Sequence, residues 1–230
     1  MPTTRAQLRD RAKRRADMVN STFVADAEWN DWINEGLCEL HDLLVLAYEG
    51  YGLTSADITL VDETEAYALP ANFYKCKGAD FVDGDTSYSL SEFEWAERNR
   101  YRYDPVLVDV APTGAAYSYR IEGNNLRLIP RPGTGTVRLW FVPQPALLMT
   151  DASTTDIAVV VGWEELVSVS CAIKALIKEE SDPNALFAQK AELVARIKAA
   201  ASQRNIAAPK HVVDSRYGGT FGGGLRSRRF

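Results

Sequence analysis

The chain has 230 residues, a net charge of −5 and 46% hydrophobic residues, which is typical of a soluble globular protein that folds around its own core. Its cysteines, Cys38, Cys76 and Cys171, lie far apart, so we expect no disulfide framework or zinc site, and a reducing compartment. No apolar run has the length of a membrane span, and none follows the basic N-terminus as a secretory signal requires.

The net charge hides an asymmetry along the chain. Residues 1–20 and 209–230 each carry +4, so the 188 residues between them carry −13. Basic termini on an acidic body are typical of segments that meet other surfaces. The body itself is expected to repel nucleic acid rather than to bind it.

Helical periodicity dominates the first 50 residues. A thin apolar stripe predicts a surface or interface helix over 4–19. A longer helix is expected over 27–49, and it is apolar on more than one face, which indicates packing on more than one side. Asp26 is the predicted N-cap of this second helix, and Gly50 and Gly52 are expected to end it.

Short strands separated by turns are predicted over 58–148. The expected strands are 58–61, 66–69, 77–82, 117–122, 125–130 and 136–142. A hairpin turn is expected at Gly123–Asn124. Within this region, residues 90–99 are predicted to form one short helix that begins at Ser91.

Helical periodicity returns in the last third of the chain. Two helices are predicted over 163–180 and 183–205, the second capped by Asp182. The predicted class is α+β: a helical bundle of two N-terminal and two C-terminal helices, an inserted small antiparallel β domain, and an extended C-terminal arm. The corresponding domains are 1–52, 53–148, 149–208 and 209–230.

The chain carries none of the usual nucleotide-binding or hydrolase motifs, and we predict no catalytic, metal-binding or cofactor-binding residues. His41 is expected to be a buried structural or interface residue, and Cys171 a core residue. The acidic segments 62–65 and 80–85 are interpreted as solvated turns rather than as catalytic or calcium sites. The five tryptophans are expected in the core or at a subunit interface.

The C-terminal arm, residues 209–230, is the most specific feature of the sequence. Its glycines oppose a helix, and its few apolar groups cannot offset the cost of ordering a free chain. Extended, it spans up to roughly 70 Å. The candidate partner-binding residues are apolar anchors about every four positions and arginines suited to acidic groups: Tyr217, Phe221, Leu225, Phe230, Arg216, Arg226, Arg228 and Arg229. The alternative interpretation is a solubilising tail.

Several segments, taken in order, resemble a known family. They read WINEGL at 32–37, YALPANFYK at 67–75, YRIEGN at 119–124, LRLIP at 126–130, WEE at 163–165 and KEESDP at 178–183. In this order, and with a C-terminal extension, the chain resembles the head-to-tail adaptor, or connector, proteins of tailed bacteriophages.

The resemblance implies a place in the neck of a virion assembled in the host cytoplasm, with no membrane contact. It implies a ring of identical subunits, expected to be a dodecamer, attached below the portal protein. The C-terminal arms would insert among portal subunits, and the β region would face tail or nozzle proteins. Double-stranded DNA would pass through the ring without sequence-specific binding, which suits an acidic wall.

Three alternatives stay open at this point. One is a head-closure or tail-completion protein of the same virion. Another is a small carboxylate-dependent hydrolase that uses acidic residues of the β region. The third is a nucleic-acid-binding module built on the cations of the first helix, which the charge of the body disfavours. Those cations are Arg5, Arg9, Arg11, Lys13, Arg14 and Arg15.

Overall fold

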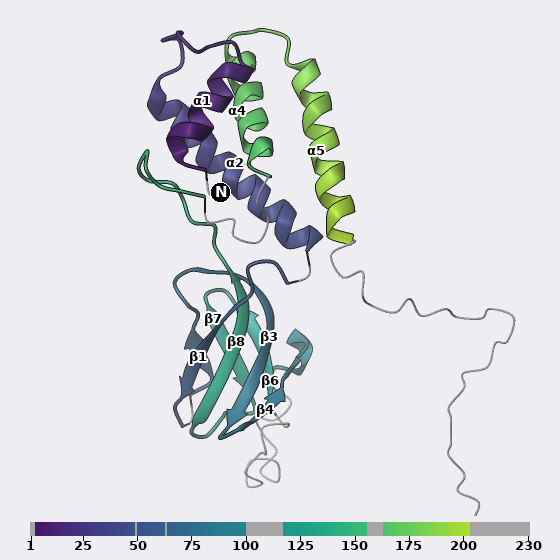
Figure 1. Ribbon diagram of the computed structural model, residues 1–230. Coiled ribbons are helices and arrows are strands. Elements are labelled where there is room, and N and C mark those ends of the chain that lie inside the picture. The colour runs from purple at the N-terminus through teal and green to yellow at the C-terminus, as the bar shows by residue number, and fades with distance from the viewer. Residues whose placement is uncertain (1–2, 49, 63, 100–116, 156–162, 203–230) are drawn as a thin grey trace, which may run out of the picture.

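The protein has a helical part and a β part that lie end to end (Figure 1). The structure is a computed structural model, and it describes residues 3–48, 50–62, 64–99, 117–155 and 163–202. Helices come first, strands follow, and helices return, so the predicted α+β class is confirmed. The predicted arm, 209–230, lies outside the described residues, and the domain boundaries stay a prediction.

The described helices pack around one apolar core. They are α1 (Arg5–Arg15), α2 (Asp26–Ala47), α4 (Glu164–Lys178) and α5 (Asn184–Ser202). The central helix is α4, which contacts the other three. Its core residues Leu166 and Val167 are buried together with Trp29 and Ile33 of α2. Burial of such side chains contributes about 1.5–3 kcal/mol each, so packing rather than helix propensity holds these elements.

Capping side chains fix the first residues of α1 and α5. Thr4 caps α1, and its side chain and that of Gln7 exchange backbone hydrogen bonds in a capping box. Asp182 accepts the backbone N–H of Asn184 at 2.9 Å, as predicted for the start of α5. The prediction that Asp26 caps α2 is wrong, because Ala25 occupies the cap and Asp26 binds Lys13 instead.

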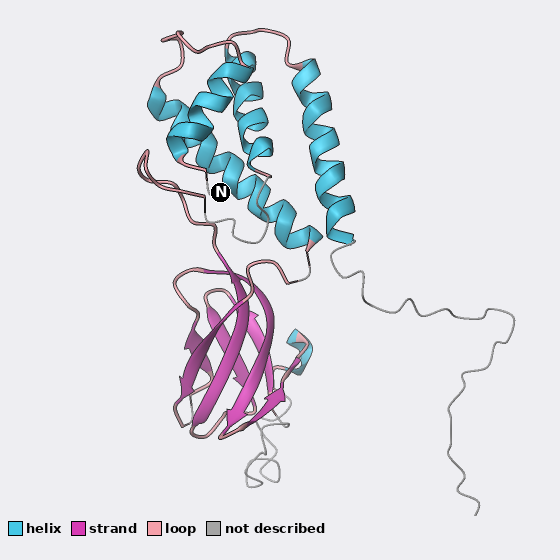
Figure 2. Cartoon of the chain, in the orientation of Figure 1, coloured by secondary structure: helices cyan, strands magenta, loops and turns pink. Residues whose placement is uncertain are grey.

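The strands form two four-stranded sheets (Figure 2). The first has the order β1 (Thr54–Leu60), β8 (Gly135–Pro143), β3 (Phe73–Asp83) and β4 (Thr86–Ser89). The second has the order β2 (Ala66–Ala68), β7 (Asn125–Ile129), β6 (Ser118–Glu122) and β5 (Ser91–Glu92). Neighbouring strands are antiparallel except β5 and β6. The two sheets share one buried cluster that includes Phe81, Leu126 and Leu139, so they form a sandwich.

The prediction of a short helix over 90–99 is wrong. This segment contains β5 and a single 3₁₀ turn, η1 (Trp95–Glu97). The backbone N–H of Leu90 donates to the carbonyl of Ala79, and that of Phe93 donates to the carbonyl of Tyr119. These backbone N–H groups therefore bond to neighbouring strands and are not available for hydrogen bonds within a helix. The side chains of Leu90 and Phe93 are buried in the sandwich.

Other sequence predictions of local structure have mixed outcomes. The hairpin at Gly123 is confirmed, with a φ of 59° that suits glycine. Cys171 is fully buried, as predicted. The solvated turn is confirmed for Asp62 and wrong for Glu65, which is half-buried and pairs with arginines. Trp95 is 50% exposed and therefore lies outside the core.

Candidate functional site

The arm residues predicted to dock on a partner, Arg216 to Phe230, lie outside the described residues. Their contacts therefore stay a prediction. The helix that leads towards them, α5, is described as far as Ser202, and its last turn lies at the end of the helical part nearest the sandwich (Figure 1).

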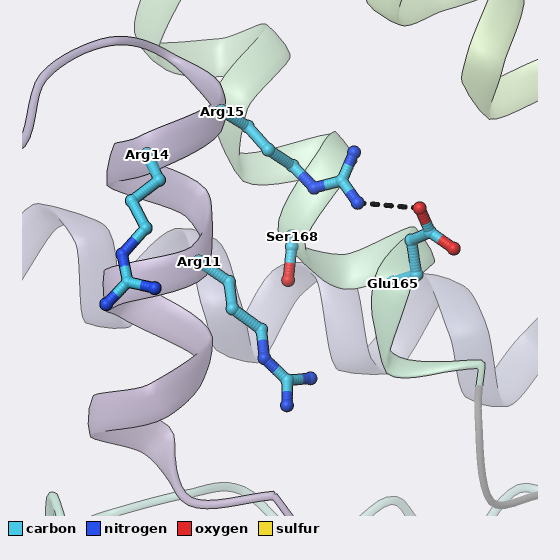
Figure 3. A pocket seen from close by; sticks show the side chains of 5 residues that line it. All are labelled: Arg11, Arg14, Arg15, Glu165 and Ser168. Carbon is cyan, nitrogen blue, oxygen red and sulfur yellow. Dashed lines mark hydrogen bonds and ion pairs between the residues drawn. The ribbon is translucent and has the colours of Figure 1, made fainter.

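A basic groove lies between α1 and α4 (Figure 3). It is lined by three arginines of α1 and two residues of α4: Arg11, Arg14, Arg15, Glu165 and Ser168. Arg14 and Arg15 follow Arg11 by three and four positions, so both lie near Arg11 on the helix surface. The adjoining side of α1 is held in the core by Leu8 and Ala12, each 0% exposed. The groove therefore rests on a firmly packed helix.

The segment that follows β8 holds α1 on the side away from the groove. Asp151 accepts hydrogen bonds from Arg5 at 2.8 Å and from Arg9 at 3.0 Å. Lys13 donates to Asp26 of α2 at 2.6 Å. The hydrogen bond from Arg9 lowers the pKa of Asp151, and that from Lys13 lowers the pKa of Asp26. Much of the basic character of α1 is thus used to attach the helix to the rest of the chain.

The groove keeps positive charge that no carboxylate of the described residues neutralises. Arg15 pairs with Glu165 at 2.6 Å and donates to Gln189 of α5. Arg11 and Arg14 are exposed, and no ion pair within the described part of the chain includes either of them. Planar guanidinium groups beside the hydroxyl of Ser168 suit an anionic group, because they donate paired hydrogen bonds to carboxylate or phosphate oxygens.

The arginines that line this groove are evident from the sequence, whereas the residues of α4 are not. The cations of α1 are visible as a run of charge, interpreted as a solvated or partner-facing surface. Glu165 and Ser168 could not be assigned to the groove, because they are some 150 positions away in sequence. Nor could sequence reasoning tell the paired Arg15 from the unpaired Arg11 and Arg14, since that depends on where α4 lies.

The junction between the two parts is built around His41, which is buried as predicted. Its ring lies edge-on to Tyr51 and Tyr74, with centroid distances of 5.8 Å and 5.3 Å. The hydroxyl of Tyr74, on β3, donates to Asp42 of α2 at 2.6 Å. Burial lowers the pKa of His41. The neutral ring therefore serves packing between α2 and the sandwich, in agreement with the structural role expected.

The described residues hold no group of three side chains arranged to bind a metal ion. No described helix is long and apolar enough to cross a membrane.

The structure is that of an α+β protein with a basic groove, and comparison with known proteins identifies its family. The family model described as SU10 adaptor protein matches residues 3–213. The chain belongs to this family of phage head-to-tail adaptors, which are structural proteins, and the resemblance seen in the sequence is confirmed. The chain is therefore a component of the virion neck. No curated protein matches the chain.

Proposed function

We propose that the chain is a ring-forming head-to-tail adaptor that docks on the portal protein through its C-terminal arm. The ring, expected to be a dodecamer, provides a platform for tail or nozzle proteins and a channel for DNA. The observation that carries this proposal is the family match over residues 3–213, because it includes the helices, the sandwich and the beginning of the arm. The role requires contacts and no catalytic step or cofactor.

The arm suits docking by coupled folding and binding. Its first three anchors, Tyr217, Phe221 and Leu225, are separated by glycines that allow close backbone approach. Its arginines can pair with acidic groups of a portal cleft. A single arm gains little after the cost of ordering. Many arms presented by one ring act together, so attachment becomes far tighter than any one contact.

The acidic charge of the chain supports the proposed channel for DNA. Between the basic termini the chain carries −13. DNA must slide through a neck without being retained, and retention by proteins depends on Lys and Arg that neutralise phosphates. An acidic wall repels the phosphates and leaves the duplex free to move.

The arm's role is tested by deleting residues 209–230 and measuring co-sedimentation with purified portal rings. We expect the wild type to sediment with the portal and the truncated chain to stay in the supernatant. A full-length control with serine at the four anchors separates the loss of anchors from the loss of length. Unchanged co-sedimentation of the truncated chain would contradict the arm's role. A head-closure protein would bind only portals that already carry another ring.

A further inference from the structure

We infer that the basic groove of one subunit receives the outer face of α2 from a second copy of this chain, with Asp31 as the carboxylate that meets Arg11 and Arg14. The inference rests on the proposed ring and names the surfaces that join neighbouring subunits. It follows from two sets of charges, on opposite faces, that have no partner among the described residues.

The first set is on α1. Four of its six cations have carboxylate partners in the same chain: Arg5 and Arg9 with Asp151, Lys13 with Asp26, and Arg15 with Glu165. Arg11 and Arg14 have none among the residues that the structure describes. Both line the same hollow, one helical turn apart, so their charges add at one place (Figure 3).

The second set is on α2, whose charged residues are all acidic. Four of its six carboxylates pair with lysines of the same chain: Asp26 with Lys13, Glu28 with Lys178, Glu35 with Lys174 and Glu39 with Lys190. A fifth, Asp42, accepts a hydrogen bond from the hydroxyl of Tyr74. Asp31 is exposed and has no partner in the described ranges. The carboxylate left over on α2 therefore matches in sign the guanidinium groups left over on α1.

The two sets lie on opposite faces of the helical part. Ile33 of α2 is in the core, and Asp31, two positions earlier, lies about 160° around the helix from it. Likewise Val167 of α4 faces α2 at Gly36, and Glu165 lies about 160° around α4 from it. The groove thus opens on the side of α4 turned away from α2, which passes behind α4 in Figure 3.

Complementary patches on opposite faces make a head-to-tail contact. Each copy then presents its groove to one neighbour and its Asp31 face to the other, and repetition of such a contact produces a ring or a filament. A phosphate of DNA would also satisfy the arginines. The acidic charge of the body opposes the approach of DNA, whereas a second copy brings Asp31, a carboxylate with no cation beside it in the described part of the chain.

The test is charge reversal followed by sedimentation velocity of the full chain over a range of concentrations and salt. We expect Arg11→Glu with Arg14→Glu to weaken self-association at least about tenfold, and Asp31→Arg to weaken it as well. An equimolar mixture of the two variants, or the triple variant, should recover association. Lys75→Glu with Lys77→Glu is the matched control, because both lysines are exposed on β3 and the charge change is equal.

Thermal unfolding of each variant checks that the body is folded. Association that is unchanged in the Arg11 and Arg14 variant, or lost equally in the Lys75 and Lys77 control, overturns the inference. So does a variant that loses binding to double-stranded DNA while it still associates, which would assign the groove to nucleic acid. Portal co-sedimentation is measured separately, so failure of this contact is distinguishable from failure of the adaptor function.

Discussion

Gly36 of α2 lies against Val167 of α4, and a Cβ added at Gly36 would lie 3.2 Å from Cγ1 of Val167. Both residues are buried in the helical core. A glycine inside a helix costs about 0.5–1 kcal/mol relative to alanine, so close packing of the two helices is what compensates for it here. The position of α4, and with it the groove, depends on this contact.

Replacing Gly36 with leucine should therefore separate α2 from α4. We expect the Gly36→Leu variant to lose about 1–3 kcal/mol of unfolding free energy, the usual cost of overpacking a core. Urea denaturation of the wild type and the variant measures this. Ala27→Leu, at an exposed position of the same helix, is the control and should change stability little. Equal stability of the Gly36 variant and the wild type would contradict the packing described.

The pairs that hold α1 should make stability depend on pH. The pKa values of Asp26 and Asp151 are lowered in the folded protein, so their stabilisation is present above the ordinary Asp pKa and is lost as the pH falls through the folded values. We expect the urea midpoint to fall below about pH 4, and to fall less steeply in Asp151→Asn. Asp10→Asn, at an exposed position of α1, should keep the steep fall. An identical pH profile for Asp151→Asn and the wild type would argue against the pairing.

The cysteines should differ in reactivity. Cys171 is 0% exposed, and burial raises the pKa of its thiol to about 12, so it carries almost no thiolate at pH 8. Cys38 is half-buried and offers an accessible thiol. We expect iodoacetamide to modify Cys38 in the native protein and Cys171 only after unfolding, as measured by peptide mass spectrometry. Equal rates at the two positions in native protein would show that the helical core opens readily.

Arg127 should stabilise the sandwich through its carboxylate partners. It pairs with Glu65 at 3.1 Å and with Glu122 at 3.3 Å, and its side chain is only 18% exposed. Arg127→Met would leave both carboxylates partly buried, although Arg131 still pairs with Glu65. We expect a loss of about 1–2 kcal/mol in urea denaturation. Arg138→Met, which removes an exposed pair with Asp57, should cost less, and the reverse order would be evidence against a structural role for Arg127.

Sequence periodicity predicted the elements whose pattern is strong and local. The helices at 163–180 and 183–205 are confirmed as far as the structure describes them, because their apolar stripes and the Asp182 cap depend on nearby residues. The segment 90–99 was mispredicted because its backbone bonds to Ala79 and Tyr119, which lie elsewhere in the sequence. The extra strand β4 was missed because its sequence, TSYS, is polar and short.

The groove, too, depends on contacts between residues that are distant in the sequence. The charge of Arg11 and Arg14 can be counted from the sequence, but their lack of partners cannot. Arg15 is equally basic and has Glu165, only because α4 brings that carboxylate within 2.6 Å. Which cations remain available to another molecule is a property of the packed helices.

A ring of this chain on the portal would be visible by electron microscopy of portal rings incubated with excess purified protein. We predict an additional coaxial ring of density below each portal, with extensions that reach between portal subunits. Portal particles that show no added density at saturating protein, or that carry it away from the symmetry axis, would contradict the account.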